Sequence, residues 1–412
     1  MKLGPGLNPR TSNKTALGTV LKYAAGGALV GMVAAAIFFY GNLGNWDDAS
    51  ARSRSFNIAN FNWKKNIIID QTKVKGNTDL MDFPVMISLE EEYLKSRMYG
   101  GQLENDHGYD VIFSDYSGNI LWHQVEKYDP STGRYIAWVK VPKLSTDEMT
   151  TISMYYGSSS ITSNTSGDGV WDNNYGGVWH LENNFMDATA HGNDGSDQNT
   201  TQSSDGLVAG ALNFMGIKDE IGSVVHIEDN SSIDLHESGT VEAWIYVKTF
   251  QDWAGVIYKG ESDDFSDDSY FIQFWGNGDN QKIIFGLRDE SGTYSYERSE
   301  IDLKAEEWYH IAFTWDQSKL QLYVNGYDYG SKVNRLSARN TSAGLNIGTQ
   351  VNSDPSKFPF DGIIDEVRIS NIARSQAWIA TQYNNQKDPA SFYRIEEEQQ
   401  VRIEKEQGDK MN

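Results

Sequence analysis

The chain has 412 residues, which is too long for one ordinary domain and suits two or three. Its formal net charge of −22 repels phosphate backbones, so no nucleic acid is expected as a partner, and the absence of cysteine excludes disulfides and thiolate metal sites. Aromatic residues make up 12% of the chain, and 38 glycines stand against 8 prolines, which favours β-sheet with tight turns over helix bundles.

The first predicted element is an apolar helix at residues 23–46. These 24 residues carry no charge, and at about 1.5 Å each they span the hydrocarbon core of a bilayer. Basic side chains precede the helix and two aspartates follow it, so residues 1–22 should remain in the cytoplasm. We therefore predict a single-pass cell-membrane protein with a polar stalk at 47–62 and its bulk outside the cell. The flanking charges are Lys2, Arg10, Lys14, Lys22, Asp47 and Asp48.

Three other interpretations of this segment remain open. Ala49-Ser50-Ala51 fits the small-residue pattern of a signal-peptide cleavage site, and a buried core helix is also compatible with the composition. The stretch KTALGTVLKYAAGGALVGMVAAAIFF resembles the N-terminal helices of archaeal pilin-like proteins, although the usual basic-Gly processing signal is missing. That resemblance implies self-association through the helix, which would pack into a filament core.

Residues 63–158 read as a first set of strands. In RYIAWVKVP, alternation places one set of residues on one face, namely Tyr135, Ala137, Val139 and Val141. The other face carries Ile136, Trp138 and Lys140, which predicts a sheet with one buried and one partly wet face. The run from KKNIIIDQTKV through GYDVIFSDYSGNILWHQVEKYD to the closing MYYGS resembles the bacterial and archaeal domain family DUF2341. The resemblance implies a β-sandwich in exported proteins, with no established chemistry.

A serine- and threonine-rich linker at 159–169 leads to a second set of strands at 170–393. Many short strands without intervening helices predict a two-sheet sandwich, and KLQLYVNG ends in Asn-Gly, a strong hairpin-turn signal. The alternating apolar positions predicted for one face are Val241, Ala243, Ile245 and Val247 in TVEAWIYV, and Tyr309, Ile311, Phe313 and Trp315 in EEWYHIAFTWD.

This second block also resembles a known family. GVWHLENNFMDATAHGNDG, ALNFMG, TVEAWIYV, EEWYHIAFTWDQSKLQLYVNG, DGIIDEVRIS and WIATQYNNQKDPASFY are similar, in this order, to the concanavalin A-like, laminin-G-like domain of microbial surface proteins. The resemblance implies a jelly-roll sandwich that binds sugars or proteins, frequently with one calcium ion. The charged tail at 394–412 is expected to be a frayed helix or disordered. The predicted fold class is therefore all-β, with two consecutive β-sandwich, jelly-roll-like domains behind an N-terminal transmembrane helix.

The segment FDGIIDEVRIS places a carboxylate among aliphatic side chains. In a regular strand, Asp365 shares a face with Ile363, Val367 and Ile369, where an ionised carboxylate needs a cation, a donor cluster or a proton. The laminin-G-like resemblance implies a calcium ion with a structural role, held by Asp365 and by Asp187 of an early loop. The alternative is that Asp365 accepts backbone hydrogen bonds or pairs with an arginine.

Other candidate residues are aromatic, acidic or imidazole groups near turns. Trp253 and Trp275 adjoin turn-like sequence, where an exposed indole can bind a ligand by stacking on a sugar ring; burial is the alternative for each. The acidic run ESDDFSDDS lacks EF-hand spacing and is expected to be a solvated loop. His180, His191 and His310 lack metal-type spacing and are expected to be hydrogen-bonded strand or loop residues.

The sequence contains no nucleophile elbow, P-loop, Rossmann fingerprint or HExxH motif, so we do not expect an enzyme. We expect a membrane-anchored, adhesin- or lectin-like protein whose laminin-G-like domain recognises a glycan or a surface protein without catalysis. The alternative is a structural subunit of an extracellular filament or envelope layer, packed through its N-terminal helix.

Overall fold

The computed structural model describes residues 56–401 except residues 166, 217–221, 263 and 277–280. The chain divides into two units, Met1–Arg54 and Ser55–Asn412, and the described residues belong to the second. The predicted cytoplasmic segment 1–22, the predicted membrane helix 23–46 and the stalk up to residue 55 lie outside them. Across the described ranges, no helix combines the length and apolar character needed to cross a bilayer.

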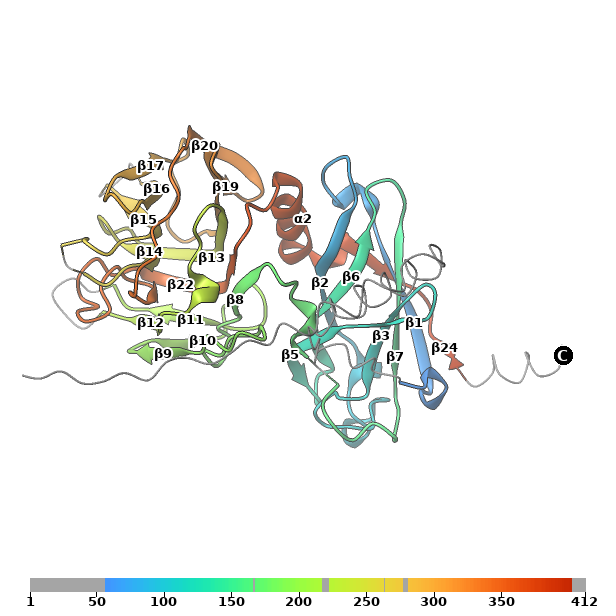
Figure 1. Cartoon of the computed structure of the whole chain (residues 1–412). Helices are drawn as coiled ribbons and strands as arrows, with labels where there is room; N and C mark the ends of the chain where they lie inside the picture. The colour runs from blue at the N-terminus through green and yellow to red at the C-terminus, as the bar shows by residue number, and fades with distance from the viewer. Residues whose placement is uncertain (1–55, 166, 217–221, 263, 277–280, 402–412) are drawn as a thin grey trace, which may run out of the picture. The chain divides into compact units, whose positions relative to one another are not determined.

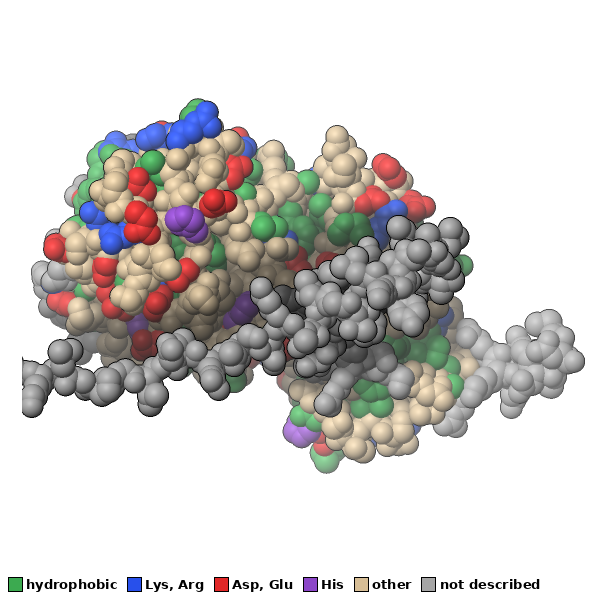
Figure 2. Space-filling model, in the orientation of Figure 1, with side chains coloured by type: hydrophobic (Ala, Val, Ile, Leu, Met, Phe, Trp, Pro, Cys, Tyr) green, Lys and Arg blue, Asp and Glu red, His purple; other side chains and the backbone are tan. Residues whose placement is uncertain are grey.

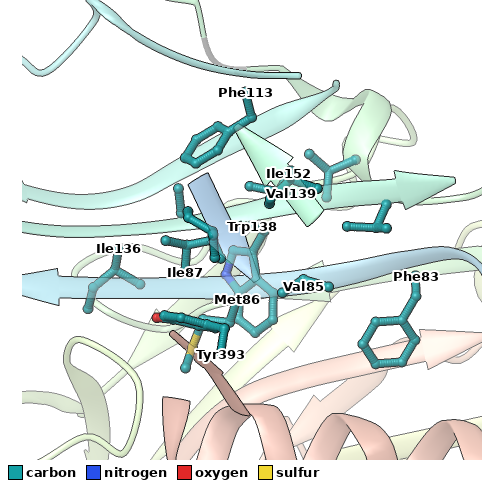
Figure 3. Packing of buried hydrophobic residues seen from close by; sticks show 14 of the residues in the cluster. Phe83, Val85, Met86, Ile87, Phe113, Ile136, Trp138, Val139, Ile152 and Tyr393 are labelled. Atoms are coloured by element: carbon teal, nitrogen blue, oxygen red, sulfur yellow. The ribbon is translucent and has the colours of Figure 1, made fainter. Parts of the chain in front are cut away.

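Two antiparallel sheets form the first sandwich (Figure 1). One runs in the order β23 (Tyr393–Ile395), β1 (Trp63–Ile69), β7 (Thr150–Tyr156), β3 (Val111–Asp115) and β4 (Ile120–Leu121), and β24 (Gln399–Gln400) also pairs with β1. The other runs β2 (Leu80–Glu90), β6 (Arg134–Leu144) and β5 (His123–Asp129). Side chains from both sheets meet in one core, including Ile87, Phe113, Val139 and Ile152 (Figure 3).

The second sandwich is built in the same way from two longer sheets. The first sheet runs β10 (Thr201–Ser203), β11 (Ala211–Phe214), β22 (Asp361–Ser370), β13 (Gly239–Thr249), β18 (Trp308–Trp315), β19 (Lys319–Val324) and β20 (Tyr327–Val333), with β8 (Tyr175–Trp179) also on β22. The second runs β17 (Tyr294–Arg298), β16 (Lys282–Arg288), β15 (Tyr270–Trp275), β14 (Gly255–Lys259), β21 (Leu345–Ile347), β12 (Val224–Ile227) and β9 (Gly195–Gln198).

Helices are few in the described residues, so the predicted β class is confirmed at that level. The α-helices are α2 (Gln376–Lys387) and α3 (Pro389–Phe392). The 3₁₀ turns are η1 (Ile58–Asn60), η2 (Gln71–Lys73), η3 (Glu92–Leu94), η4 (Arg97–Tyr99), η5 (Asp168–Val170) and η6 (Ser231–Ile233). All eight apolar positions predicted on β13 and β18 lie in the core of the second sandwich, because strict alternation holds along both strands.

The end of the chain returns to the first sandwich. After β22, helices α2 and α3 lead into β23 and β24, and both strands pair with β1. The two sandwiches are therefore not strictly consecutive, because the second is inserted before the last strands of the first. The expectation of a frayed or disordered tail is wrong for residues 394–400, where these strands form; residues 402–412 lie outside the described residues.

Helix α2 and β23 close an open edge of the first sandwich. Strand β2 is the edge of its sheet, so the N–H and C=O groups of every second residue point away from β6 and lack a partner strand. Asn385 accepts a hydrogen bond from the Met86 N–H at 2.7 Å and donates one to the Met86 carbonyl at 3.0 Å. The Tyr393 hydroxyl contacts the same two groups of Ser88 at 2.8 and 3.0 Å. These side chains supply the partners that a neighbouring strand would otherwise provide.

The outer face of strand β6 is buried at Ile136 and Trp138, whereas Lys140 on the same face is partly exposed, in agreement with a partly wet face. Ile136 and Trp138 are 1% and 0% exposed. Figure 3 shows Met86 and Tyr393 beside the Trp138 indole. On the side of the second sandwich, the guanidinium carbon of Arg368 lies 4.2 Å from the centroid of the Trp138 ring. The face of β6 that carries Ile136 and Trp138 therefore forms part of the contact between the two sandwiches.

Strand β22 contains a β-bulge that changes its predicted faces. Its pairing with β13 shifts between Asp365 and Arg368, and Glu366 has a φ of +53°. One extra residue breaks the two-residue alternation, so Ile364 and Val367, three positions apart, both lie in the core of the second sandwich. The predicted faces assumed a regular strand and are wrong for this reason.

Substitution Asn385→Ala tests the closure of the β2 edge. We expect it to lower the free energy of unfolding by about 2–4 kcal/mol, because it leaves a buried N–H and a buried carbonyl of Met86 without partners. Urea unfolding followed by tryptophan fluorescence measures the change. The control is Gln376→Ala on the exposed side of the same helix, for which we expect less than about 0.5 kcal/mol. Equal effects of the two substitutions would contradict the proposed closure.

Candidate functional site

A groove of about 390 Å³ lies on the outer face of the sheet β17–β16–β15–β14. Alternation explains its position: on β16, Ile283 and Phe285 face the core of the sandwich, whereas Ile284 between them lines the groove. The strands contribute Tyr258, Phe271, Gln273, Ile284, Tyr294, Tyr296 and Arg298, and the adjoining loops contribute Trp253, Phe265, Asp268, Gln350 and Phe358.

Three loop aromatics of the groove have left-handed backbone conformations. The φ angles of Trp253, Phe265 and Phe358 are +63°, +59° and +57°. For bulky L-residues this region costs on the order of 1 kcal/mol each, and such strain clusters at ligand sites. The rings of Phe265 and Phe358, from different loops, contact each other with centroids 5.8 Å apart. The tertiary fold thus holds these three aromatic residues at the groove in a backbone conformation that bulky L-residues normally avoid.

Several groove aromatics expose their rings to solvent. Trp253, Tyr294 and Tyr296 are 41%, 37% and 44% exposed, while Tyr258 and Phe271 beneath them are stacked with centroids 5.6 Å apart. Adjacent exposed aromatic surface marks an interaction site more often than scattered apolar residues do. Because tyrosine and tryptophan combine a flat apolar face with a polar tip, they suit ligands that are both apolar and hydrated.

Buried polar groups lie between these rings. Asp268 is 2% exposed; its Oδ2 accepts a hydrogen bond from the Tyr294 hydroxyl at 2.6 Å, and its Oδ1 has no partner among the described residues. Burial raises the pKa of Asp268 to about 6, although hydrogen bonds from Tyr294 and Tyr258 oppose the shift. Gln350 donates to the Oε1 of Gln273 at 2.9 Å, which orients the Gln273 amide. The groove therefore offers hydrogen-bonding groups inside an aromatic lining.

The structure places both predicted ligand-binding tryptophans near this groove. Trp253 lines it, and Trp275 on β15 lies beside it beneath Arg298, whose guanidinium carbon is 3.6 Å from the indole centroid. Their role in ligand binding stays a prediction. The acidic run at 261–269 is not simply a solvated loop, because its Asp268 is buried in the groove. The signal missed in the sequence is YSYER, whose alternation exposes every second residue of an edge strand.

The predicted calcium ligands have hydrogen-bond partners from the protein. Asp187 accepts hydrogen bonds from three backbone N–H groups and from the Thr189 hydroxyl, at 2.8–3.0 Å. Asp365 accepts from the N–H groups of Leu207 and Val208 at 2.8 and 2.9 Å. Burial, with Glu366 adding to it, raises the pKa of Asp365 well above its usual value. These contacts agree with the structural alternative for Asp365, and a calcium ion at this pair stays a prediction.

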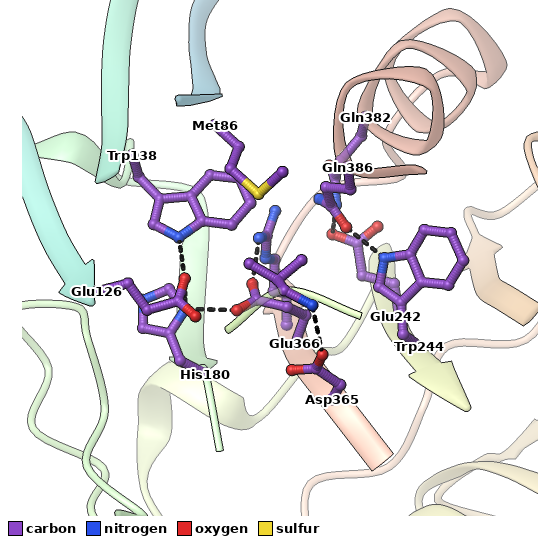
Figure 4. A network of polar contacts seen from close by, with 12 residues as sticks. Met86, Glu126, Trp138, His180, Glu242, Trp244, Asp365, Glu366, Gln382 and Gln386 are labelled. Atoms are coloured by element: carbon purple, nitrogen blue, oxygen red, sulfur yellow. Dashed lines mark hydrogen bonds and ion pairs between the residues drawn. The ribbon is translucent and has the colours of Figure 1, made fainter. Parts of the chain in front are cut away.

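A second polar cluster lies where the two sandwiches meet (Figure 4). Glu126 of β5 contributes one carboxylate, and His180 and Glu366 come from the second sandwich, with ligand atoms within 4.8 Å of one another. The Nδ1 of His180 is 2.7 Å from Glu366 and 3.5 Å from Glu126. The ligand types suit a metal ion, but Arg368 also pairs with Glu366 and already supplies a cation. The geometry therefore favours an ion-pair network.

The pKa shifts within this network follow from burial and neighbouring charges. Burial, and then Glu366, raises the pKa of Glu126 well above its usual value. Burial also disfavours charge on Glu366, but His180 and Arg368 outweigh it and lower the pKa of Glu366. For His180, burial is likewise outweighed, here by Glu366 and Glu126, and its pKa rises. Within this pair the neutral form is favoured on Glu126 and the negative charge on Glu366. His180 is a hydrogen-bonded residue as expected, but its partners were not visible in the spacing.

Comparison with known proteins confirms both family resemblances and their order. Residues 107–192 match the domain of unknown function DUF2341, and residues 219–380 match the concanavalin A-like lectin/glucanases superfamily. The protein therefore carries a DUF2341 domain followed by a concanavalin A-like domain. No curated protein matches the sequence.

The chain is similar to several solved structures, including the following three. Domain 4 of AbnA, a GH43 extracellular arabinanase from Geobacillus stearothermophilus solved with arabinotriose, has 18% identity and a TM-score of 0.40, with 50% of this chain and 96% of that chain covered. The binding domain of Paraclostridial Mosquitocidal Protein 1 has 16% identity and a TM-score of 0.41, with 51% and 52% covered. That of Botulinum Neurotoxin DC with SialylT has 13% identity and a TM-score of 0.40, with 52% of each chain covered.

These likenesses carry no argument about the ligand of this protein, because the identities and TM-scores are low. The chain spans about half the length of the two toxin binding domains.

A pair of substitutions tests the interface network. Glu366→Gln should lower the free energy of unfolding by about 3–5 kcal/mol at pH 7, because it leaves Arg368 as a buried cation without its carboxylate. Glu126→Gln should change it by less than about 1 kcal/mol, because the raised pKa of Glu126 favours its neutral form and an amide oxygen can still accept from the Trp138 indole N–H. Urea unfolding measures both values, and the reverse order would contradict this assignment of charge.

The raised pKa of Asp268 predicts a pH-dependent contribution to stability. The pKa of Asp268 is about 6 in the folded state, above the ordinary value of 3.8. Its contribution to stability is therefore fully present below pH 3.8 and is lost as pH rises through about 6. Relative to Asp268→Asn, which does not titrate, the wild type should lose about 2–3 kcal/mol between pH 4 and pH 8 in urea unfolding.

Asp264→Asn is the control in the same loop. Hydrogen bonds from Ser266 and Ser262 lower the pKa of Asp264 to about 2, so its contribution to stability is lost only as pH falls below about 4. The stability difference between Asp264→Asn and wild type should therefore stay nearly constant from about pH 4 to pH 8. A difference between Asp268→Asn and wild type that does not vary with pH would contradict the buried, titrating carboxylate.

Proposed function

We propose that this protein is a non-catalytic glycan-binding protein of the cell surface, and that the groove of the second sandwich binds an oligosaccharide. The observation that carries the proposal is the strained backbone at Trp253, Phe265 and Phe358, which holds three aromatic rings around an open groove. Sugar rings present apolar C–H faces that pack on such aromatic rings, and their hydroxyl groups can bond the unpartnered Oδ1 of Asp268 and the oriented amide of Gln273.

The composition of the groove supports binding rather than catalysis. Glycoside hydrolysis commonly uses two carboxyl groups on opposite sides of the scissile bond. Among the described residues that line the groove, Asp268 is the one with a carboxyl group. The concanavalin A-like superfamily includes lectins in its name as well as glucanases, so a binding role is compatible with the family match.

The proposed location rests on the sequence. The apolar segment 23–46 would anchor the chain, and the stalk would separate the membrane from the first sandwich. The inserted topology would then present the second sandwich on the first, with the C-terminal strands paired to β1.

Binding of the full-length protein to a glycan array tests the function. We expect at least one class of oligosaccharide to bind, and Trp253→Ala and Tyr296→Ala each to weaken its affinity at least tenfold, because each removes an exposed stacking ring. Tyr116→Ala is the matched control, since Tyr116 is 89% exposed on the first sandwich and outside the groove. The proposal fails if no glycan binds, or if the groove variants bind as well as the control; selective capture of a protein would also count against it.

A further inference from the structure

The two ends of the groove differ in chemistry. On β17, Tyr294, Tyr296 and Arg298 share the groove face, while Ser295 between them is buried. Arg298 stands four positions after Tyr294 on this extended strand, which is about 13 Å. Asp268 is hydrogen-bonded to Tyr294 and so lies at one end, whereas Arg298 lies at the other. A ligand that spans the groove therefore meets the buried carboxyl group of Asp268 at the Tyr294 end and the exposed guanidinium of Arg298 at the other. The guanidinium carbon of Arg288 also lies 5.0 Å from the centroid of the Tyr294 ring, but Arg288 donates to the backbone carbonyls of Gly292 and Phe265.

Arg298 is held in a geometry suited to an anion. Its side chain is exposed and stacks on Trp275, and no carboxylate among the described residues forms an ion pair with it. Stacking limits the rotamers of the long side chain but leaves the N–H groups in the plane of the guanidinium free. The chain has 57 acidic and 35 basic residues, so carboxylates that could pair with an arginine are plentiful. The lack of such a pair at Arg298 among the described residues therefore favours an anionic ligand as the partner of its guanidinium.

A second basic residue reinforces this end of the groove. Lys332 of β20 donates to the carbonyl of Tyr296 at 3.0 Å, and its ammonium lies 5.5 Å from the centroid of the Tyr296 ring. Figure 2 shows Lys and Arg side chains gathered at the upper edge of the second sandwich, where Figure 1 places β17 and β20. The local positive charge contrasts with the negative charge of the whole chain.

We propose that the groove selects an acidic oligosaccharide, with the carboxylate of one sugar paired to Arg298 and the neighbouring rings stacked on Tyr296 and Tyr294. A planar carboxylate matches the two parallel N–H donors of a guanidinium, which gives both affinity and orientation. Hydroxyl groups of the sugars at the other end bond Asp268. This inference rests on the proposed glycan-binding function and adds the class of sugar.

Matched pairs of ligands test the class. Titration calorimetry of the full-length protein compares oligogalacturonate, oligomannuronate and hyaluronan fragments with the methyl-esterified form of each, which keeps the rings and removes the charge. We expect at least one acidic form to bind at least tenfold more tightly than its ester. Arg298→Gln should abolish that difference, whereas Trp253→Ala should weaken both members of the pair.

Two further variants separate charge from structure. Arg298→Lys keeps the charge but loses the planar fork, so it should retain only part of the preference. Arg335→Gln, at an exposed arginine of the same sandwich outside the groove lining, should leave the preference unchanged. Equal binding of acid and ester, or a preference that survives Arg298→Gln, would overturn the acidic class and leave glycan binding in place. No binding of any acidic or neutral oligosaccharide would overturn both proposals.

Discussion

The first sandwich depends on the pairing of two strand edges, those of β1 and β2, whose partners come from outside residues 63–158. Strand β1 gains its outer neighbours, β23 and β24, only after the whole second sandwich has been traversed, and the β2 edge is closed by Asn385 and Tyr393 from the same distant segment. Unpaired edges invite aggregation, and buried unpaired backbone groups are costly. The first sandwich therefore takes the partners of these two edges from the end of the chain.

Helix α2, which closes the β2 edge of the first sandwich, also contacts the second sandwich. Its Gln382 donates to Glu242 at 2.9 Å, and its Gln386 accepts from the indole of Trp244, both residues of β13 (Figure 4). One helix thus hydrogen-bonds a strand of each sandwich. Together with the Glu366–Arg368 pair against Trp138, these contacts make the interface specific, because each buried charge needs a partner in a fixed position. A stable base of this kind suits a groove on the far sheet of the second sandwich.

The groove differs from this interface, because its loops have strained backbones and its edge strand exposes side chains to solvent. Strand β17 is the last strand of its sheet, and alternation along YSYER turns two tyrosines and an arginine to the outer face. The neighbouring loops add aromatic rings at positive φ, held by contacts such as that between Phe265 and Phe358. The strands below and the strained loops above hold the aromatic surfaces in place, which would reduce the entropy lost when the proposed ligand binds.

Sequence alone determined the local features of this protein. Alternation predicted the core faces of β13 and β18, Asn325-Gly326 predicted a hairpin turn, and two ordered sets of motifs identified both domains, because these signals depend on neighbours along the chain. Tertiary structure alone decided the bulge at Glu366, the pairing of β23 with β1, and the meeting of Glu126, His180 and Glu366. It also placed Asp268 and Arg298 at two ends of one groove. These features join residues far apart in sequence, and each depends on which partner lies across a sheet or an interface, which no local pattern records.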